Sequence, residues 1–393
     1  MELFKASNQW ATRPADERFW DVPEMLQSCE AYKASSQEAQ VKYSDLRFEA
    51  EGREIFITGK ARTQARLSHW AFGQVCQKVG APASYLRTLP ATLAVQNLNH
   101  GYSKPAEMEM EEDYARLMFH RNGSLILRAA TSLKYKRIWN ADIVSRIQEY
   151  IPQGWQVPPA RPSGVANERT RKATAIDVLR LGKGGLSIKE GDLIAPAGLY
   201  ASDHDMFMFM VNETNRVNDG TGHGLGRGFF LWNSEVGASS VGIMSFLYDA
   251  VCGNHICWGV KNVEEIRIRH IGNADSKSFS SIRAELISYA NSSVSDLEAQ
   301  IKAARTYEFG GVGADKDAVV AAVLAYATKV KAPISQAIVS RAYDVTEERG
   351  RYGSPRSAWG IANGLTELSQ ESTYTDERVK IDRAAGKLLQ IVF

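Results

Sequence analysis

Residues 220–259, GTGHGLGRGFFLWNSEVGASSVGIMSFLYDAVCGNHICWG, predict the centre of the fold. Glycines at alternate positions (220, 222, 224, 226 and 228) open the stretch, and their backbone freedom predicts a mobile loop. Residues 229–232, FFLW, have the length and character of a strand. Residues 233–237, NSEVG, read as a turn rich in Asn, Ser and Gly. Residues 239–252 read as a strand that passes into a helical turn, and 255–260 as a last apolar stretch.

Length and composition indicate a folded protein of several domains. With 393 residues the chain is too long for one ordinary core, so two or three domains are expected. Hydrophobic residues make up 44% and charged residues 23%, which is typical of a globular chain rather than a disordered one. The net charge of +2 neither requires nor excludes a nucleic-acid partner.

The expected location is the cytoplasm of a bacterial host cell, without contact with a membrane. The first residues, MELFKASNQWATRP, lack an apolar signal core, and no apolar run reaches the roughly eighteen residues of a membrane span. The cysteines are too few for a disulfide scaffold and fit a reducing compartment. They are Cys29, Cys76, Cys252 and Cys257.

The element pattern predicts an α+β protein in four parts. Residues 1–40 form a docking arm, and 41–104 form a small α+β domain with a hairpin around Glu51 and Gly52. In that domain Ser68 caps one helix, and a second helix starts near Pro90 and buries Leu93 and Leu98. Residues 105–290 form a central, mostly antiparallel sheet domain with basic and glycine-rich loops. Residues 291–393 form a helical region.

Two finer expectations concern the borders of these parts. Residues 114–150 read as one strand (125–127), a polar bend and a helix (143–151). Residues 295–298, SDLE, read as a capping box that starts the first helix of the carboxy-terminal region. Further helices are expected over 355–368 and 376–389.

The string WNSEVGASSVGIMSFLYDAVCGNHICWG, residues 232–259, resembles a phage- and plasmid-encoded family catalogued as domain of unknown function 932. That family carries a similar Asn-Ser-Glu-Val-Gly turn and, further on, a Cys-x-Asn element, here residues 252–254. The likeness extends in pattern to residues 68–98 and 357–386. The resemblance implies a protein of a mobile element and brings no established activity.

Motifs for nucleotide binding and catalysis are missing from the sequence. Neither GxxxxGK[ST] nor a GxGxxG placed between a strand and a helix occurs. Residues 252–257, CGNHIC, contain zinc-ligand types at a spacing that matches no standard structural site. Pairing Cys257 as a nucleophile with His270 has only residue type behind it. We therefore expect no metal and no cofactor, and a binding protein rather than an enzyme.

An acidic segment keeps a hydrolase open as an alternative. Asp203 and Asp205 alternate along a predicted strand, and His223 follows in the glycine-rich loop. Carboxylates on one strand face together with an imidazole could hold a catalytic cation. The simpler interpretation is a polar turn before the strand at residues 206–211.

Basic residues concentrate between residues 116 and 183, with aromatic residues among them. Single-strand binders need a positive groove for phosphates and aromatic faces for stacking, and both residue types occur here. The simpler interpretation is a set of scattered surface charges around core aromatics. The candidate nucleic-acid-binding residues are Arg121, Arg128, Lys134, Tyr135, Lys136, Arg137, Trp139, Arg169, Arg171, Lys172 and Arg227.

The function that these residues favour is nucleic-acid binding in the DNA metabolism of a phage or plasmid, as a single-stranded DNA binder or an annealing or recombination factor. The α+β order suggests an analogy with ring-forming annealing proteins, so a homo-oligomer is a candidate form. Two alternatives stay open: the metal-dependent hydrolase built on Asp203, Asp205 and His223, and an interaction protein that counteracts a host defence factor.

Overall fold

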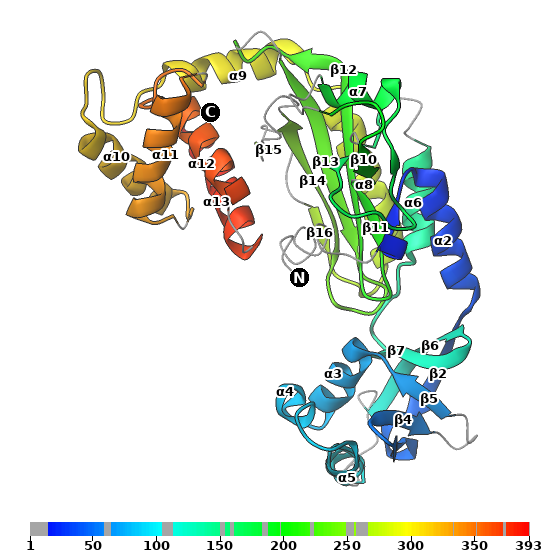
Figure 1. Cartoon of the computed structure of the whole chain (residues 1–393). Helices are drawn as coiled ribbons and strands as arrows, with labels where there is room; N and C mark the ends of the chain where they lie inside the picture. Colours follow the sequence, from blue (N-terminus) through cyan, green and yellow to red (C-terminus); the bar gives the residue numbers. More distant parts are fainter. Residues whose placement is uncertain are drawn as a thin grey trace.

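A computed structural model describes residues 15–58, 64–103, 113–149, 154–157, 161–182, 188–196, 198–220, 224–248, 255–256, 266–332, 334–350, 352–371 and 375–392. Figure 1 shows three lobes arranged as an arch. A small amino-terminal lobe lies below, a central sheet forms the back, and a helical lobe reaches over from the top. The predicted α+β class, with a mostly antiparallel central sheet and a helical carboxy-terminal region, is confirmed.

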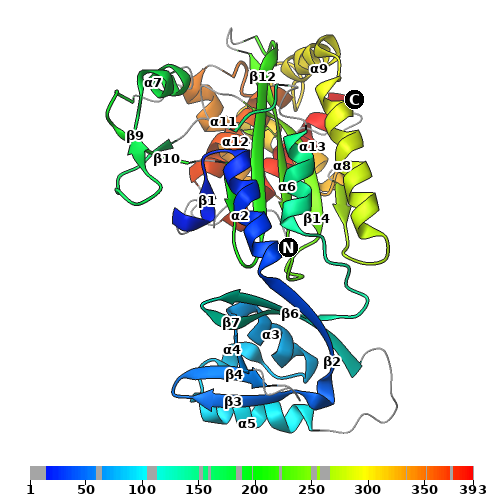
Figure 2. The ribbon, with the colours of Figure 1, turned by 90° about the vertical axis from the view of Figure 1, so that its right-hand side faces the viewer.

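The central lobe is built on an antiparallel sheet with three helices on its outer face (Figures 1 and 2). Alternate residues of its longest strand point to opposite sides: Met206, Met208 and Met210 pack under the helices, whereas Phe207 and Phe209 join an aromatic cluster on the other face. The strands are β1 (Arg18–Phe19), β11 (Leu199–Ala201), β12 (Met206–Val217), β13 (Leu225–Asn233), β14 (Val241–Tyr248), β15 (His255–Ile256) and β16 (Ile266–Ile268), and the helices are α2 (Val22–Ala34), α6 (Asn140–Gln148) and α8 (Ala274–Ala290).

The prediction of a mobile loop over the glycine-rich segment, residues 220–228, is wrong for its second half. Gly226 and Gly228 are buried residues of β13 rather than members of a mobile loop. Gly228 lies opposite Phe246 of β14, and a Cβ atom at Gly228 would stand 2.3 Å from that ring. Gly228 therefore lacks a side chain to make room for an aromatic ring on the next strand, and the last two alternate glycines belong to a strand rather than to a loop. Residues 221–223 of the predicted loop lie outside the described residues.

The amino-terminal lobe is a mixed sheet with helices packed on one face. The predicted hairpin is confirmed: β3 and β4 pair across a turn in which Gly52 has φ 62°. Ser68 caps the following helix, as predicted, by accepting a hydrogen bond from the amide of Ala71. The elements are β2 (Ser36–Lys42), β3 (Arg47–Glu51), β4 (Glu54–Thr58), β5 (Gln64–Leu67), β6 (Tyr114–Asn122), β7 (Ser124–Ser132), α3 (His69–Lys78), α4 (Ala83–Leu86) and α5 (Ala91–Tyr102).

Two expectations for this lobe are wrong. Leu93 is 49% exposed, although Leu98 on the same helix is fully buried. The predicted border at residues 104/105 also falls too early. Residues 114–132 form a hairpin of two strands, β6 and β7, that completes the amino-terminal sheet in the order β2-β6-β7-β5-β4-β3. The apolar side chains of this hairpin, such as Leu117 and Leu127, belong to the core under α3 and α5, which no local pattern shows.

The amino-terminal segment joins the two lobes. β1 pairs with β11 of the central sheet, α2 packs against α6, and β2 then crosses directly into the lower lobe (Figure 2). A small three-stranded sheet with one helix projects from the opposite end of the central lobe. It consists of β8 (Arg161–Pro162), β9 (Arg171–Lys172), β10 (Leu193–Ala195) and α7 (Ala175–Gly182).

The carboxy-terminal lobe is a bundle of helices. The expected helices near residues 355–368 and 376–389 are confirmed. The first helix of this lobe is capped by Ser293, whose hydroxyl accepts a hydrogen bond from the amide of Asp296, and not by the predicted box at 295–298. Gly364 lets two helices meet closely, since a Cβ there would lie 2.2 Å from the carbonyl oxygen of Ala342. The helices are α9 (Val294–Thr306), α10 (Lys316–Lys329), α11 (Gln336–Arg349), α12 (Ala358–Glu371) and α13 (Thr375–Leu389). Within the described part of the chain, every helix is too short or too polar to cross a membrane.

Candidate functional site

Residues 233–236 of the turn at 233–237 are buried where the amino-terminal lobe meets the lower end of the central sheet. Its carbonyl groups accept hydrogen bonds from outside the turn. The Tyr135 hydroxyl donates to the Ser234 carbonyl at 2.8 Å. The Val236 carbonyl accepts from Trp70 Nε1 at 3.0 Å and from Gln74 Nε2 at 2.8 Å. Trp70 and Gln74 belong to α3, so this turn fastens the two lobes to each other.

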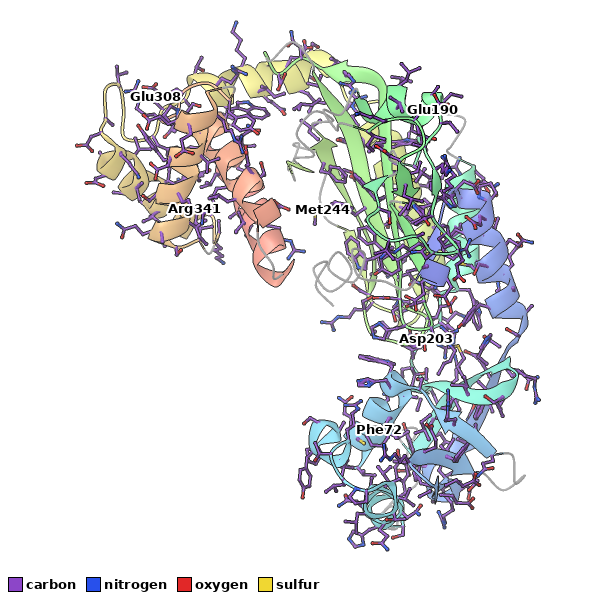
Figure 3. All side chains as sticks on the ribbon, in the orientation of Figure 1. Phe72, Glu190, Asp203, Met244, Glu308 and Arg341 are labelled. Carbon is purple, nitrogen blue, oxygen red and sulfur yellow. The ribbon has the colours of Figure 1, made fainter. Side chains whose placement is uncertain are left out.

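The carboxylate of Glu235 is the charged centre of this junction. Its Oε2 lies 3.3 Å from Arg128, and its Oε1 accepts the Asn140 amide at 2.7 Å. Arg128 also donates to the Asp203 carbonyl at 2.5 Å and stacks over the ring of Tyr32 at 4.7 Å. Figure 3 shows Asp203 at the end of the sheet that faces the lower lobe. Arg128 and Glu235 are each 2% exposed, so the pair depends on these further partners.

Two histidines of the junction are held neutral. Burial and the nearby Arg128 lower the pKa of His120, which stacks on Tyr32 and lies 2.9 Å from the Ser35 hydroxyl. Burial lowers the pKa of His270 to about 4, and the Lys136 carbonyl lies 3.1 Å from its Nδ1. Groups that stay neutral near pH 7 and face the interior fit a structural role better than acid–base chemistry.

Most of the predicted phosphate-binding arginines are engaged inside the protein. Arg137 is buried and donates to Glu38 and to the Glu235 carbonyl, and Arg227 is buried and donates to the Ser292 carbonyl at 2.5 Å. With Arg128, these side chains cannot contact a phosphate in this structure. The cause is that each of them joins segments distant in sequence, which a local count of charge cannot show.

The predicted arginines near residue 170 also have internal partners. Arg169 pairs with Glu24 and lies over Phe19. Arg171 binds Asp177 with both terminal nitrogens, at 2.6 and 2.8 Å, and this hydrogen bonding lowers the pKa of Asp177. Both arginines therefore anchor the projecting sheet. Their charges are largely neutralised by the paired carboxylates.

The two predicted stacking residues are half-buried. Tyr135 holds the Ser234 carbonyl and stacks on His270, with the ring centres 5.0 Å apart. Trp139 packs in a small apolar cluster, with Arg137 over its ring at 5.8 Å. Neither aromatic residue presents a free face of the kind that a stacked base needs.

Besides Arg171, which is exposed but paired with Asp177, four predicted cations are exposed: Arg121, Lys134, Lys136 and Lys172. Lys134 and Lys136 flank Tyr135, which forms a β-bridge with Ile271. The bridge brings in an exposed arginine that sequence reasoning missed, Arg269. We call Lys134, Lys136 and Arg269 the basic ridge. Lys172 lies on β9 of the projecting sheet, which Figure 2 shows at the upper left of the central lobe, so the predicted basic surface is divided.

Asp203 and Asp205 do not have the arrangement that the hydrolase alternative requires. Ser202 and Asp205 close the turn before β12, where the Ser202 hydroxyl lies 3.0 Å from Asp205 Oδ1. Asp205 is 2% exposed and its Oδ2 lies 3.4 Å from His204, whereas Asp203 is exposed. The two carboxylates thus do not share a face, because they lie in a turn and not in a strand. His223 lies outside the described residues.

Metal ligands do not gather elsewhere in the described ranges. No group of three His, Cys, Asp or Glu side chains there could hold an ion. Cys252 and Cys257, of the CGNHIC element, lie outside those ranges, while Cys29 and Cys76 are buried free thiols. Burial raises the pKa of Cys76 to about 11, which leaves its thiol protonated and unreactive near pH 7.

The family model described as a domain of unknown function, DUF932, matches residues 143–385. The chain belongs to this family. The DUF932 match contains the buried turn at 233–237 but not Arg128, Trp70 or Gln74, which hold that turn from the amino-terminal lobe. No curated protein and no solved structure matches the chain.

Proposed function

We propose that this DUF932 protein binds single-stranded nucleic acid through phosphate contacts on the basic ridge. The observation that supports the proposal is the β-bridge between Tyr135 and Ile271, which brings the segment with the exposed Lys134 and Lys136 beside the segment with the exposed Arg269. Within the described part of the chain, Lys136 and Arg269 form no ion pair. Exposed cations without acidic partners can neutralise phosphates at low cost.

The proposed role is the handling of single-stranded DNA in a mobile element, in line with the sequence resemblance. Three phosphate contacts give a weak and salt-sensitive interaction, and a slope of roughly −2 in log affinity against log salt at about −0.7 per contact. Such binding gains strength when several copies act on one strand. A homo-oligomer therefore belongs to the proposal, and a sizing column run with and without oligonucleotide measures it.

The test is fluorescence anisotropy of a labelled single-stranded oligonucleotide across a salt series. The variant Lys134→Ala/Lys136→Ala/Arg269→Ala is expected to lose most of the affinity and most of the salt slope. The matched control removes three exposed lysines elsewhere, Lys189, Lys302 and Lys329. It carries the same change in net charge and is expected to bind like the wild-type protein. Equal weakening in both variants would mean that only total charge matters and would reject the ridge.

A further inference from the structure

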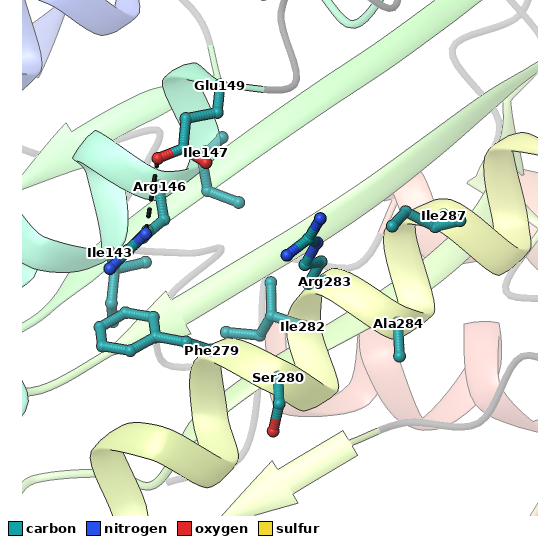
Figure 4. Close-up of a pocket in the computed structure, with 10 residues that line it drawn as sticks. All are labelled: Ile143, Arg146, Ile147, Glu149, Phe279, Ser280, Ile282, Arg283, Ala284 and Ile287. Carbon is teal, nitrogen blue, oxygen red and sulfur yellow. Dashed lines mark ion pairs between the residues drawn. The ribbon is translucent and has the colours of Figure 1, made fainter.

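A groove runs between α6 and α8 on the outer face of the central lobe (Figure 4). Its volume is 390 Å³. Apolar side chains from both helices line it, among them Ile147 and Phe279, and Ile287 remains 40% exposed at one end. Arg146 of α6 and Arg283 of α8 also line it (Figure 4). The groove thus combines an apolar floor with a positive rim.

The groove exists because neighbouring helices on this face are unevenly spaced. α2 packs closely against α6, whereas the backbones of α6 and α8 lie further apart. The face of the sheet beneath the groove is already covered, because Phe229, Leu231 and Ile243 are fully buried. A ligand would therefore lie between two helices and above a finished core, where another helix could pack.

The charges of the rim favour an acidic ligand. Arg146 stacks over Phe279 at 5.7 Å, and its ion pair with Glu149 spans 3.6 Å with both side chains 61% exposed. Such an exposed pair contributes little to stability, so a ligand carboxylate can replace it. Arg283 is exposed and forms no ion pair within the described ranges. Among the described residues that line the groove, Glu149 is the one acidic residue.

We propose that this groove binds an acidic amphipathic helix of a partner protein. Helices recognised in this way place apolar residues of one face into a groove and keep charged residues at its edges. A small molecule fits less well, because small-molecule sites enclose most of their ligand. Here the arginines and Ile287 are open to solvent. The inference is independent of nucleic-acid binding, since it uses neither Lys134, Lys136 nor Arg269.

The test is selection from a displayed library of amphipathic helical peptides whose polar faces are either acidic or basic. Wild-type protein is the bait, and selected peptides are then titrated against Arg283→Glu/Ile287→Asp. Both side chains are partly or largely exposed, so the variant is expected to fold, which its thermal melting confirms. The matched control, Lys172→Glu/Ile176→Asp, makes the same change in net charge and also replaces an isoleucine by Asp, at exposed positions of β9 and α7.

Support would be enrichment of acidic helices that bind the control like wild type and the groove variant at least tenfold more weakly. Arg283→Glu alone should then reverse the preference toward basic helices. The proposal is overturned if no peptide is enriched, if basic helices win, or if the groove variant binds as tightly as the control. A wild-type dimer that Arg283→Glu dissociates would also overturn it, since a second copy would then occupy the groove.

Discussion

The guanidinium of Arg128 lies 3.3 Å from the carboxylate of Glu235, and this buried pair joins the amino-terminal lobe to the turn of the central sheet. Arg128→Met leaves the carboxylate buried without its countercharge, so it should lower the free energy of unfolding by about 3 to 5 kcal/mol. Urea denaturation measures the loss. Adding Glu235→Gln removes the stranded charge and keeps an acceptor for the Asn140 amide, so the double variant should recover part of the stability. A double variant that is no more stable than Arg128→Met would contradict this account.

Gly228 and Phe246 form a second pair whose geometry can be tested. Gly228→Ala places a methyl group where the aromatic ring lies, so the expected loss is about 1 to 3 kcal/mol from overpacking. Gly228→Ala/Phe246→Leu should be more stable than Gly228→Ala alone, because the smaller side chain gives way. The control is Gly164→Ala, since a Cβ at Gly164 meets nothing within 4 Å. It should stay within about 0.5 kcal/mol of wild type.

His270 should make stability depend on pH. Burial lowers its pKa from 6.5 to about 4, so between these values the unfolded chain binds more protons than the folded one. The stabilisation is therefore complete above pH 6.5 and is lost as pH falls toward 4. Unfolding in urea should show a loss of about 2 to 3 kcal/mol between pH 7 and 4.5 from this group. His270→Gln should flatten that dependence but not remove it, because the pKa of His120 is lowered too. An unchanged pH dependence would show that folding does not lower the pKa of His270.

Local patterns predicted elements whose cause is local. Ser68 caps its helix with its own hydroxyl, and Gly52 allows the turn of a hairpin. Residues 229–232, a run of apolar residues, form part of a strand. The same patterns failed where the cause is distant. The alternate glycines were interpreted as a loop because the ring that excludes a side chain at Gly228, that of Phe246, is on the next strand.

The prediction of the candidate site from the sequence failed for the same reason. Positive charge between residues 116 and 183 looked like one surface, but Arg128 pairs with Glu235 and Arg169 with Glu24, both far away in the chain. Conversely, Arg269 joins Lys136 only through a bridge between distant loops. Residue type indicated the chemistry, and only the tertiary arrangement separated structural cations from exposed ones.

The paired and the exposed cations should respond differently to substitution. Arg171→Ala removes the two hydrogen bonds to Asp177, so it should lower thermal stability while leaving the salt slope of single-stranded DNA binding unchanged. Lys136→Ala should do the reverse: the fold keeps its stability, because the side chain is exposed, and the slope becomes shallower by about 0.7. Thermal melting and anisotropy on the same two variants make the comparison, with Lys189→Ala as the control for loss of one exposed charge. If Arg171→Ala flattened the slope and Lys136→Ala did not, phosphate binding would lie on the projecting sheet, and the basic ridge would be the wrong surface.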